Sequence, residues 1–214
     1  MQIVEEDIAC AAASRGNVMI TGERGTGKRS VAGLIHRKSG RRGGPFVIGG
    51  RIDLVDYRCQ DPESGPLQAA RNGTFLLEEL DAIHPQDGAD LIRFVDCGVE
   101  SSNVRFMAAT SIPLCDRVRA GQFPESLFYR LNVIHVVLPP LRERPEDIPV
   151  LLRHFMLNGG AGDVDFSTAA WDRLSAYSWP GNLQQLKAFG EALAGGDGRR
   201  QLDVRDLPPE ILAA

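Results

Sequence analysis

The chain has 214 residues, of which 43% are hydrophobic and 24% charged, and its net charge is -4. This length predicts one sizeable domain with room for a small appendage. The composition argues against a nucleic-acid-binding surface, because no segment gathers Lys and Arg densely, and the basic cluster at 37–42 is typical of a solvated helix end.

The cysteines, histidines and apolar segments exclude several other classes. The four cysteines and four histidines lack metal-ligand spacing, which argues against a zinc site or a disulfide framework and favours reduced thiols. Residues 1–7 are acidic and do not resemble a signal peptide, and no apolar run reaches the ~18 residues of a membrane span. We therefore expect a cytoplasmic protein that does not contact a membrane.

Five short apolar segments predict the strands of an α/β domain. The first, at 17–21, is rich in β-branched residues, and a glycine-rich loop follows it at once. Helical spacing of apolar residues then predicts a helix that opens near Lys28. Further strands are predicted at 45–48, 74–77, 103–109 and 133–138. Because helical segments separate the strands, we expect a parallel sheet flanked by helices.

After two prolines at 139–140, only helices are predicted. They are expected at 147–157, 168–177 and 182–194, followed by a short terminal turn and helix at 202–211. Ser167 suits the N-cap of the second, and the tryptophans at 171 and 179 suit core packing. The expected organisation is an α/β core at 1–140 and a small all-helical lid at 141–214.

The glycine-rich loop matches the phosphate-loop pattern G-x-x-x-x-G-K in full. Its glycines let backbone N–H groups surround phosphates, and the following helix directs its N-terminus at the same anion. Lys28 adds a positive charge near the β- and γ-phosphates. Arg29 stands where the general pattern has Ser or Thr for magnesium. The pattern predicts ATP binding by Gly22, Glu23, Arg24, Gly25, Thr26, Gly27, Lys28 and Arg29.

Two carboxylates, Glu78 and Glu79, end the predicted strand at 74–77. In a phosphate-loop enzyme this place holds the acid that coordinates magnesium (Mg2+) and the residue that polarises the attacking water. Further along, Arg142 and Arg144 leave two interpretations open, because they suit either phosphate recognition or ion pairs with the neighbouring acids at 143 and 146.

Six motifs in order resemble the AAA+ central domain of the bacterial enhancer-binding proteins, which activate sigma-54 RNA polymerase. The phosphate loop, ITGERGTGK at 20–28, resembles the ITGESGTGKE of that family, in which a non-hydroxyl residue after the Lys is normal. The other motifs are 73–80 against GTLFLDEI, 105–111 against RVIAATN, 128–133 against YYRLNV, 138–148 against LPPLRERxEDI and 179–183 against WPGNV. The resemblance extends over about residues 14–210.

The resemblance implies a P-loop AAA+ fold and a ring, usually a hexamer, in which ATP lies between subunits and its hydrolysis remodels the promoter complex. It also implies roles by position. These are phosphate binding by Lys28, magnesium coordination by Glu78, general base catalysis by Glu79, sensor I at Ser111, an arginine finger at Arg130 and an adenine contact at Ile148.

The chain departs from the family in the polymerase-contacting loops and in the catalytic set. The GAFTGA loop should lie between Phe46 and Gly73, but the segment 47–72 is short and lacks this motif, and the segment 99–103 is short as well. The catalytic departures are Pro124 at the first finger Arg, Ser111 at the sensor I Asn, Gln184 at the sensor II Arg, Gly50 near an Asn that restrains the catalytic Glu, and Glu78 in place of Asp.

These departures separate ATP binding from ATP hydrolysis. An arginine finger is worth roughly 10³–10⁵ in rate, so we expect nucleotide binding with slow or absent hydrolysis. One functional hypothesis is a transcription regulator of the sigma-54 activator type, with sigma-54 polymerase as its partner. The other is a protein-interaction module that modulates rings of a paralogous activator without remodelling the polymerase. Both predict self-association into a ring or dimer, and no direct DNA binding by this chain.

Overall fold

A computed structural model describes residues 2–50, 65–160, 164–194 and 201–212. The chain divides into two compact units, which we call the core unit (Met1–Gly22 and Lys28–Leu138) and the lid unit (Glu23–Gly27 and Pro139–Ala214). The tip of the glycine-rich loop therefore belongs to the lid unit. Most of the segment 47–72, in which the sequence predicts a missing GAFTGA loop, lies outside the described residues.

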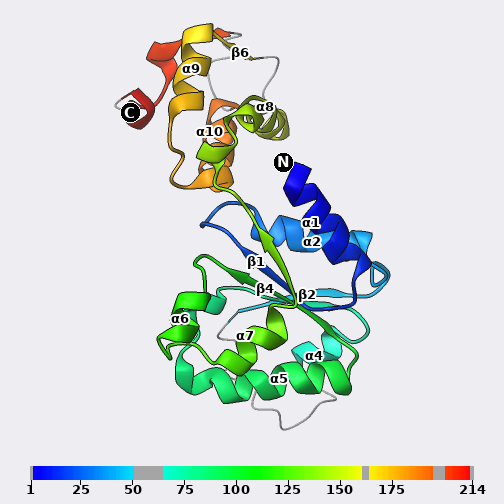
Figure 1. Cartoon of the computed structure of the whole chain (residues 1–214). Coiled ribbons are helices and arrows are strands. Elements are labelled where there is room, and N and C mark those ends of the chain that lie inside the picture. The colour runs from blue at the N-terminus through cyan, green and yellow to red at the C-terminus, as the bar shows by residue number, and fades with distance from the viewer. Residues whose placement is uncertain (1, 51–64, 161–163, 195–200, 213–214) are drawn as a thin grey trace. The chain divides into compact units, whose positions relative to one another are not determined.

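The core unit contains a five-stranded sheet in the order β2-β3-β4-β1-β5 (Figure 1). All its neighbouring strands are parallel, which confirms the predicted fold class. The central strand β1 pairs with β4 and with β5, so that Ile20 lies opposite Ala109 and Val136. The strands are β1 (Val18–Thr21), β2 (Phe46–Gly49), β3 (Thr74–Leu77), β4 (Arg105–Thr110) and β5 (Ile134–Val137).

Successive side chains of the strands enter two hydrophobic layers, one on each face of the sheet. In β4, Phe106 and Ala108 join one cluster, whereas Met107 and Ala109 join the other, as the two-residue period of a strand requires. Helices cover both faces (Figure 1). They are α1 (Gln2–Ala13) and α2 (Lys28–Lys38) on one face, and α4 (Pro66–Ala69), α5 (Gly88–Glu100) and α7 (Glu125–Leu131) on the other. Helix α6 (Cys115–Arg119) and the short turns η1 (Leu80–Ala82) and η2 (Pro85–Asp87) complete the unit.

A buried cation fixes the end of α1. Arg105 is only 2% exposed, and it donates from Nε to the Gly16 carbonyl at 2.8 Å and from Nη2 to the Ala11 carbonyl at 2.6 Å. A cation is favourable at the C-terminal carbonyls of a helix, although burial lowers the pKa of Arg105. The strand β4 thereby positions α1. The sequence analysis did not predict this helix.

The lid unit is built from helices around Trp179, which is fully buried. The Ser167 hydroxyl accepts the N–H of Ala170 and caps a helix as predicted, and Trp171 packs against the same core. The helices are α8 (Ile148–Asn158), α9 (Thr168–Ala176), α10 (Asn182–Ala194) and α11 (Pro209–Leu212), with turns η3 (Leu141–Glu143), η4 (Pro145–Asp147) and η5 (Val204–Asp206).

One correction applies to the expectation of a lid made only of helices. Strand β6 (Asp165–Phe166) pairs in parallel with β7 (Gln201–Leu202). A two-residue strand shows no alternation along the sequence, and its partner lies far along the chain, so no local pattern predicts it. Within the described ranges, none of the helices is long and apolar enough to cross a membrane.

Candidate nucleotide-binding site

The glycine-rich loop connects the end of β1 to the start of α2, as the sequence predicts. At its tip, the N–H and the hydroxyl of Thr26 both donate to the Glu23 carbonyl, at 3.3 and 2.8 Å, and close a turn. Gly25 and Gly27 have φ angles of 78° and 99°, which glycine adopts at little cost and other residues rarely adopt. Gly25 and Gly27 are therefore required by the shape of the loop.

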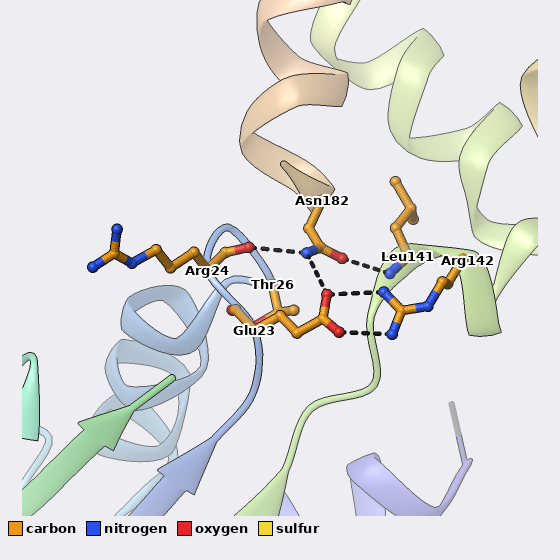
Figure 2. Close-up of polar contacts among 6 residues, drawn as sticks. All are labelled: Glu23, Arg24, Thr26, Leu141, Arg142 and Asn182. Atoms are coloured by element: carbon orange, nitrogen blue, oxygen red, sulfur yellow. Dashed lines mark hydrogen bonds and ion pairs between the residues drawn. The ribbon is translucent and has the colours of Figure 1, made fainter. Parts of the chain in front are cut away.

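The side chain of Glu23 is held by two residues of the lid unit (Figure 2). Arg142 donates to its two carboxylate oxygens at 2.6 and 2.9 Å, and the Asn182 amide donates to one of them at 3.3 Å. The hydrogen bonds from Arg142 and Asn182 lower the pKa of Glu23 to about 2. We call these three residues the Glu23 cluster. Neither predicted interpretation of Arg142 included Glu23 as its partner.

Asn182 also fixes backbone on both sides of the cluster. It is fully buried, its amide donates to the Arg24 carbonyl at 2.9 Å, and its side-chain oxygen accepts the Leu141 N–H at 2.7 Å (Figure 2). The loop tip lies so close to the backbone at Gly181 that a Cβ on Gly25 would be 2.2 Å from the Gly181 carbonyl oxygen. The WPGN motif at 179–182 thus hydrogen-bonds to the backbone of the loop tip and of Leu141. Spacing along the sequence does not reveal this role.

In the core unit, Lys28 connects the start of the loop with the end of β4. Its ammonium group donates to the Gly22 carbonyl at 2.6 Å and to the Ser111 hydroxyl at 3.3 Å. Two residues that the sequence predicts for one site, the phosphate-binding Lys and sensor I, therefore lie together. Asp81 holds Ser111 by accepting its backbone N–H at 3.1 Å. The sequence analysis did not predict Asp81 as a site residue.

The two strand-end carboxylates differ in their surroundings. Glu78 lies 3.5 Å from the Arg29 guanidinium, in a pair whose side chains are 32% and 62% exposed. Glu79 is exposed and adopts a left-handed backbone conformation, with a φ of 54°, at the start of η1. Such a conformation is uncommon for a residue other than glycine. It turns the chain immediately after the buried strand β3.

The other predicted site residues make separate contacts. Arg130 on α7 forms an ion pair with Asp96 on α5 at 2.9 Å, with both side chains 42% exposed. Ile148 is fully buried in the hydrophobic core of the lid unit. Arg144 is also buried in the lid unit and donates to the Thr26 carbonyl at 3.3 Å, with Asp147 at 4.0 Å. The adenine contact of Ile148 and the finger role of Arg130 stay predictions.

Comparison with known proteins gives matches along the whole chain. Residues 1–141 match the family described as the Sigma-54 interaction domain, and residues 142–214 match the AAA+ ATPase lid domain. The chain is 34% identical over 239 aligned positions to the regulatory protein AtoC of Escherichia coli, with 99% of this chain and 52% of AtoC covered. It is 38% identical over 220 positions to the Sigma54-dependent transcriptional activator SfnR of Pseudomonas putida, with 89% of this chain and 60% of SfnR covered.

The crystal structure of NtrX from Brucella abortus in complex with ATP superposes with a TM-score of 0.85 at 30% identity, covering 100% of this chain and 56% of NtrX. The chain thus spans little more than half the length of the relatives that it matches. The alignment with AtoC is longer than the 214 residues of this chain, so AtoC carries residues that have no counterpart here. Taken together with the parallel sheet and the phosphate loop, these matches show that the chain belongs to the Sigma-54 interaction domain family of AAA+ proteins.

Proposed function

We propose that this chain is an ATP-binding AAA+ module of the sigma-54 activator type that regulates transcription and hydrolyses ATP slowly. The observation that carries the proposal is the complete phosphate loop, with Lys28 directly after it. Lys28 and Ser111 lie within hydrogen-bond distance at the end of the sheet, where ligands bind in open α/β folds. The relative NtrX was crystallised with ATP, which supports the same ligand here.

The residues present fit a magnesium ion that arrives with the nucleotide. Mg2+ in such sites is held by one or two carboxylates together with phosphate oxygens and water, and Glu78 supplies one carboxylate. No group of three or more His, Cys, Asp or Glu residues able to hold a metal by itself occurs in the described parts of the chain. When bound, the ion would neutralise charge on the phosphates, while Arg29 competes with it for Glu78.

Slow hydrolysis is supported by the residues that would stabilise the transition state. Pro124 and Gln184 carry no charge at positions where the family has the first arginine finger and sensor II. Arg130, the remaining finger candidate, is paired with Asp96. The general base would be Glu79, whose turn after β3 is held by a hydrogen bond from the Ala82 N–H to the Glu79 carbonyl at 2.8 Å. Loss of positive charge lowers the hydrolysis rate far more than it lowers ATP affinity.

Affinity and turnover measured on one sample test this proposal. We expect calorimetry to show ATP binding. We also expect steady-state phosphate release far below the turnover typical of enzymes, which is roughly 1–10³ s⁻¹. Lys28→Ala serves as the control that removes the phosphate-binding charge. A wild-type protein that binds no ATP would refute the proposal, and rapid turnover would refute its second half.

A second candidate function is a nucleotide-dependent interaction module that assembles with paralogous activators and does not remodel sigma-54 polymerase. It is favoured by the segment 47–72, which lacks the GAFTGA motif, and by the residues of AtoC that have no counterpart here. The two functions share a proposed ring or dimer. Capture of sigma-54 by this protein with an ATP transition-state mimic supports the activator function, whereas capture of a paralogous activator without sigma-54 supports the interaction module.

A further inference from the structure

Three consecutive carbonyl groups of the phosphate-loop tip accept hydrogen bonds from residues of the lid unit. The three donors differ in kind: one is a side-chain amide, one a backbone N–H and one a guanidinium. The pairs are Asn182 Nδ2 with the Arg24 carbonyl at 2.9 Å, Leu183 N–H with the Gly25 carbonyl at 2.9 Å, and Arg144 Nη2 with the Thr26 carbonyl at 3.3 Å.

These bonds determine the direction of the loop amides. Across a trans peptide bond the C=O and the following N–H point to opposite sides, and the described residues contain no cis peptide. When the carbonyls of residues 24, 25 and 26 point to lid donors, the N–H groups of residues 25, 26 and 27 point away from those donors. The N–H of residue 26 closes the turn onto the Glu23 carbonyl at 3.3 Å, so the N–H groups that matter for phosphate binding are those of residues 25 and 27. A phosphate-binding loop requires backbone N–H groups that are oriented together.

The Glu23 cluster stabilises the same arrangement through side chains. Glu23 accepts two bonds from Arg142 in bidentate geometry, which is stronger and more directional than a single charged contact. It also accepts from Asn182, the buried residue that binds the Arg24 carbonyl. Because the pKa of Glu23 lies at about 2, its carboxylate stays charged at neutral pH. Arg142 and Glu23 therefore hold Asn182 in its place.

We infer that Arg142 and Asn182 are positioning residues of the lid unit, which act through Glu23 and the loop carbonyls to orient the phosphate-loop amides for the β-phosphate of a nucleotide. Neither residue needs to contact the phosphates for this effect. The inference rests on the proposed nucleotide binding and adds to it that affinity depends on the lid unit as well as on the glycines and Lys28.

The test compares Arg142→Gln, Glu23→Gln and the double variant with the wild-type chain. We expect each single variant to bind ADP and ATP about tenfold more weakly, and the double variant to lose no more than either single variant, because residues in one network couple strongly. Affinity for AMP should change by less than about twofold, because AMP has no β-phosphate for the loop amides to bind. A loss of AMP affinity would indicate general damage to the fold.

Arg153→Gln is the matched control. Arg153 lies in the same lid unit and pairs with Asp165 at 3.5 Å, with side chains 62% and 67% exposed, so the same charge is removed from an ion pair outside the loop contacts. We expect wild-type affinity for all three nucleotides. This control separates a general effect of charge from an effect of loop geometry.

Hydrogen exchange of the peptide covering residues 22–28 in the nucleotide-free protein supplies a readout that does not require binding. Faster exchange in Arg142→Gln and Glu23→Gln, but not in Arg153→Gln, supports the inference even if the wild-type chain were to bind no ATP and the proposed function were to fail. Unchanged exchange together with wild-type ADP affinity would overturn it. Equal losses for AMP and ADP would also overturn it.

Discussion

The loop tip in the lid unit and the predicted catalytic residues in the core unit are built differently. The loop tip is held by the buried Asn182, a bidentate ion pair and three bonded carbonyls. In the core unit, Glu78 at the end of β3 and Arg130 on α7 are each held by a single ion pair. These pairs are partly exposed, as the bidentate Arg142–Glu23 pair is too, and exposed single pairs contribute about 0–1 kcal/mol. The difference shows that the loop tip and these residues of the predicted catalytic set are held by different kinds of contact.

The largest effect is expected from adding positive charge at two positions of the predicted catalytic set, Pro124 in the core unit and Gln184 in the lid unit. We expect Pro124→Arg combined with Gln184→Arg to raise steady-state ATP hydrolysis about 10³-fold, the lower end of the effect of an arginine finger. Arginine is compatible with both places, because Pro124 has an ordinary φ of -64° at the N-cap of α7, and Gln184 is exposed. Phosphate release is the measurement.

The same double substitution in a Lys28→Ala background is the control and should remain inactive. If hydrolysis does not rise although ATP affinity is retained, the limiting defect lies elsewhere in the predicted catalytic set, for example at the Glu78–Arg29 pair.

Removal of the binding charge should have the next largest effect. We expect Lys28→Ala to weaken ATP binding about 10- to 100-fold, because hydrogen bonds that involve charged groups contribute more than neutral ones. Calorimetric titration provides the affinity, and the melting temperature without nucleotide should remain close to that of the wild type. Unchanged affinity would show that the loop tip alone binds ATP.

Gly25→Ala tests how tightly the loop tip is built. The substitution forces a side chain into a backbone with a φ of 78° and against the Gly181 carbonyl, so we expect the free energy of unfolding to fall by about 1–3 kcal/mol. Chemical denaturation provides this value. Gly40→Ala, at a position with no heavy atom within 4 Å of the added Cβ, should change it by less than about 0.5 kcal/mol. Equal effects of the two substitutions would contradict a tightly packed tip.

The smallest expected effect is a different response of the two units to acid. Burial lowers the pKa of His36, on α2 of the core unit, below its ordinary value of 6.5. The unfolded chain therefore binds a proton more readily there, and stability that is present above pH 6.5 is lost as the pH falls towards the folded-state pKa. The pKa of Glu23 is lowered from 4.5 to about 2, so its contribution is present above pH 4.5 and is lost only as the pH falls towards 2.

Melting temperatures recorded between about pH 7.5 and 5.5 check this difference. The fall in melting temperature across this range should be smaller in His36→Gln than in the wild type, and it should be unchanged in Glu23→Gln. A flatter profile for Glu23→Gln would contradict the low pKa of Glu23.

The sequence by itself determined the features whose signal is local. The phosphate loop, the five strands and the helical capping by Ser167 follow from residue spacing and from the conformational needs of glycine and serine. The order of six motifs was sufficient to indicate the family, and the carboxylates after β3 were placed on the correct strand end. These predictions needed no knowledge of which distant residues meet.

Only the tertiary structure decided the partners of these residues. Glu23 meets Arg142 and Asn182 across 119 and 159 positions of the chain, and Arg105 reaches the end of α1 across 94 positions. No periodic pattern relates residues so far apart, because their contact depends on how complete elements pack. The loop motif thus predicted phosphate binding, whereas only the fold showed that residues of the lid unit donate hydrogen bonds to the loop carbonyls and to Glu23.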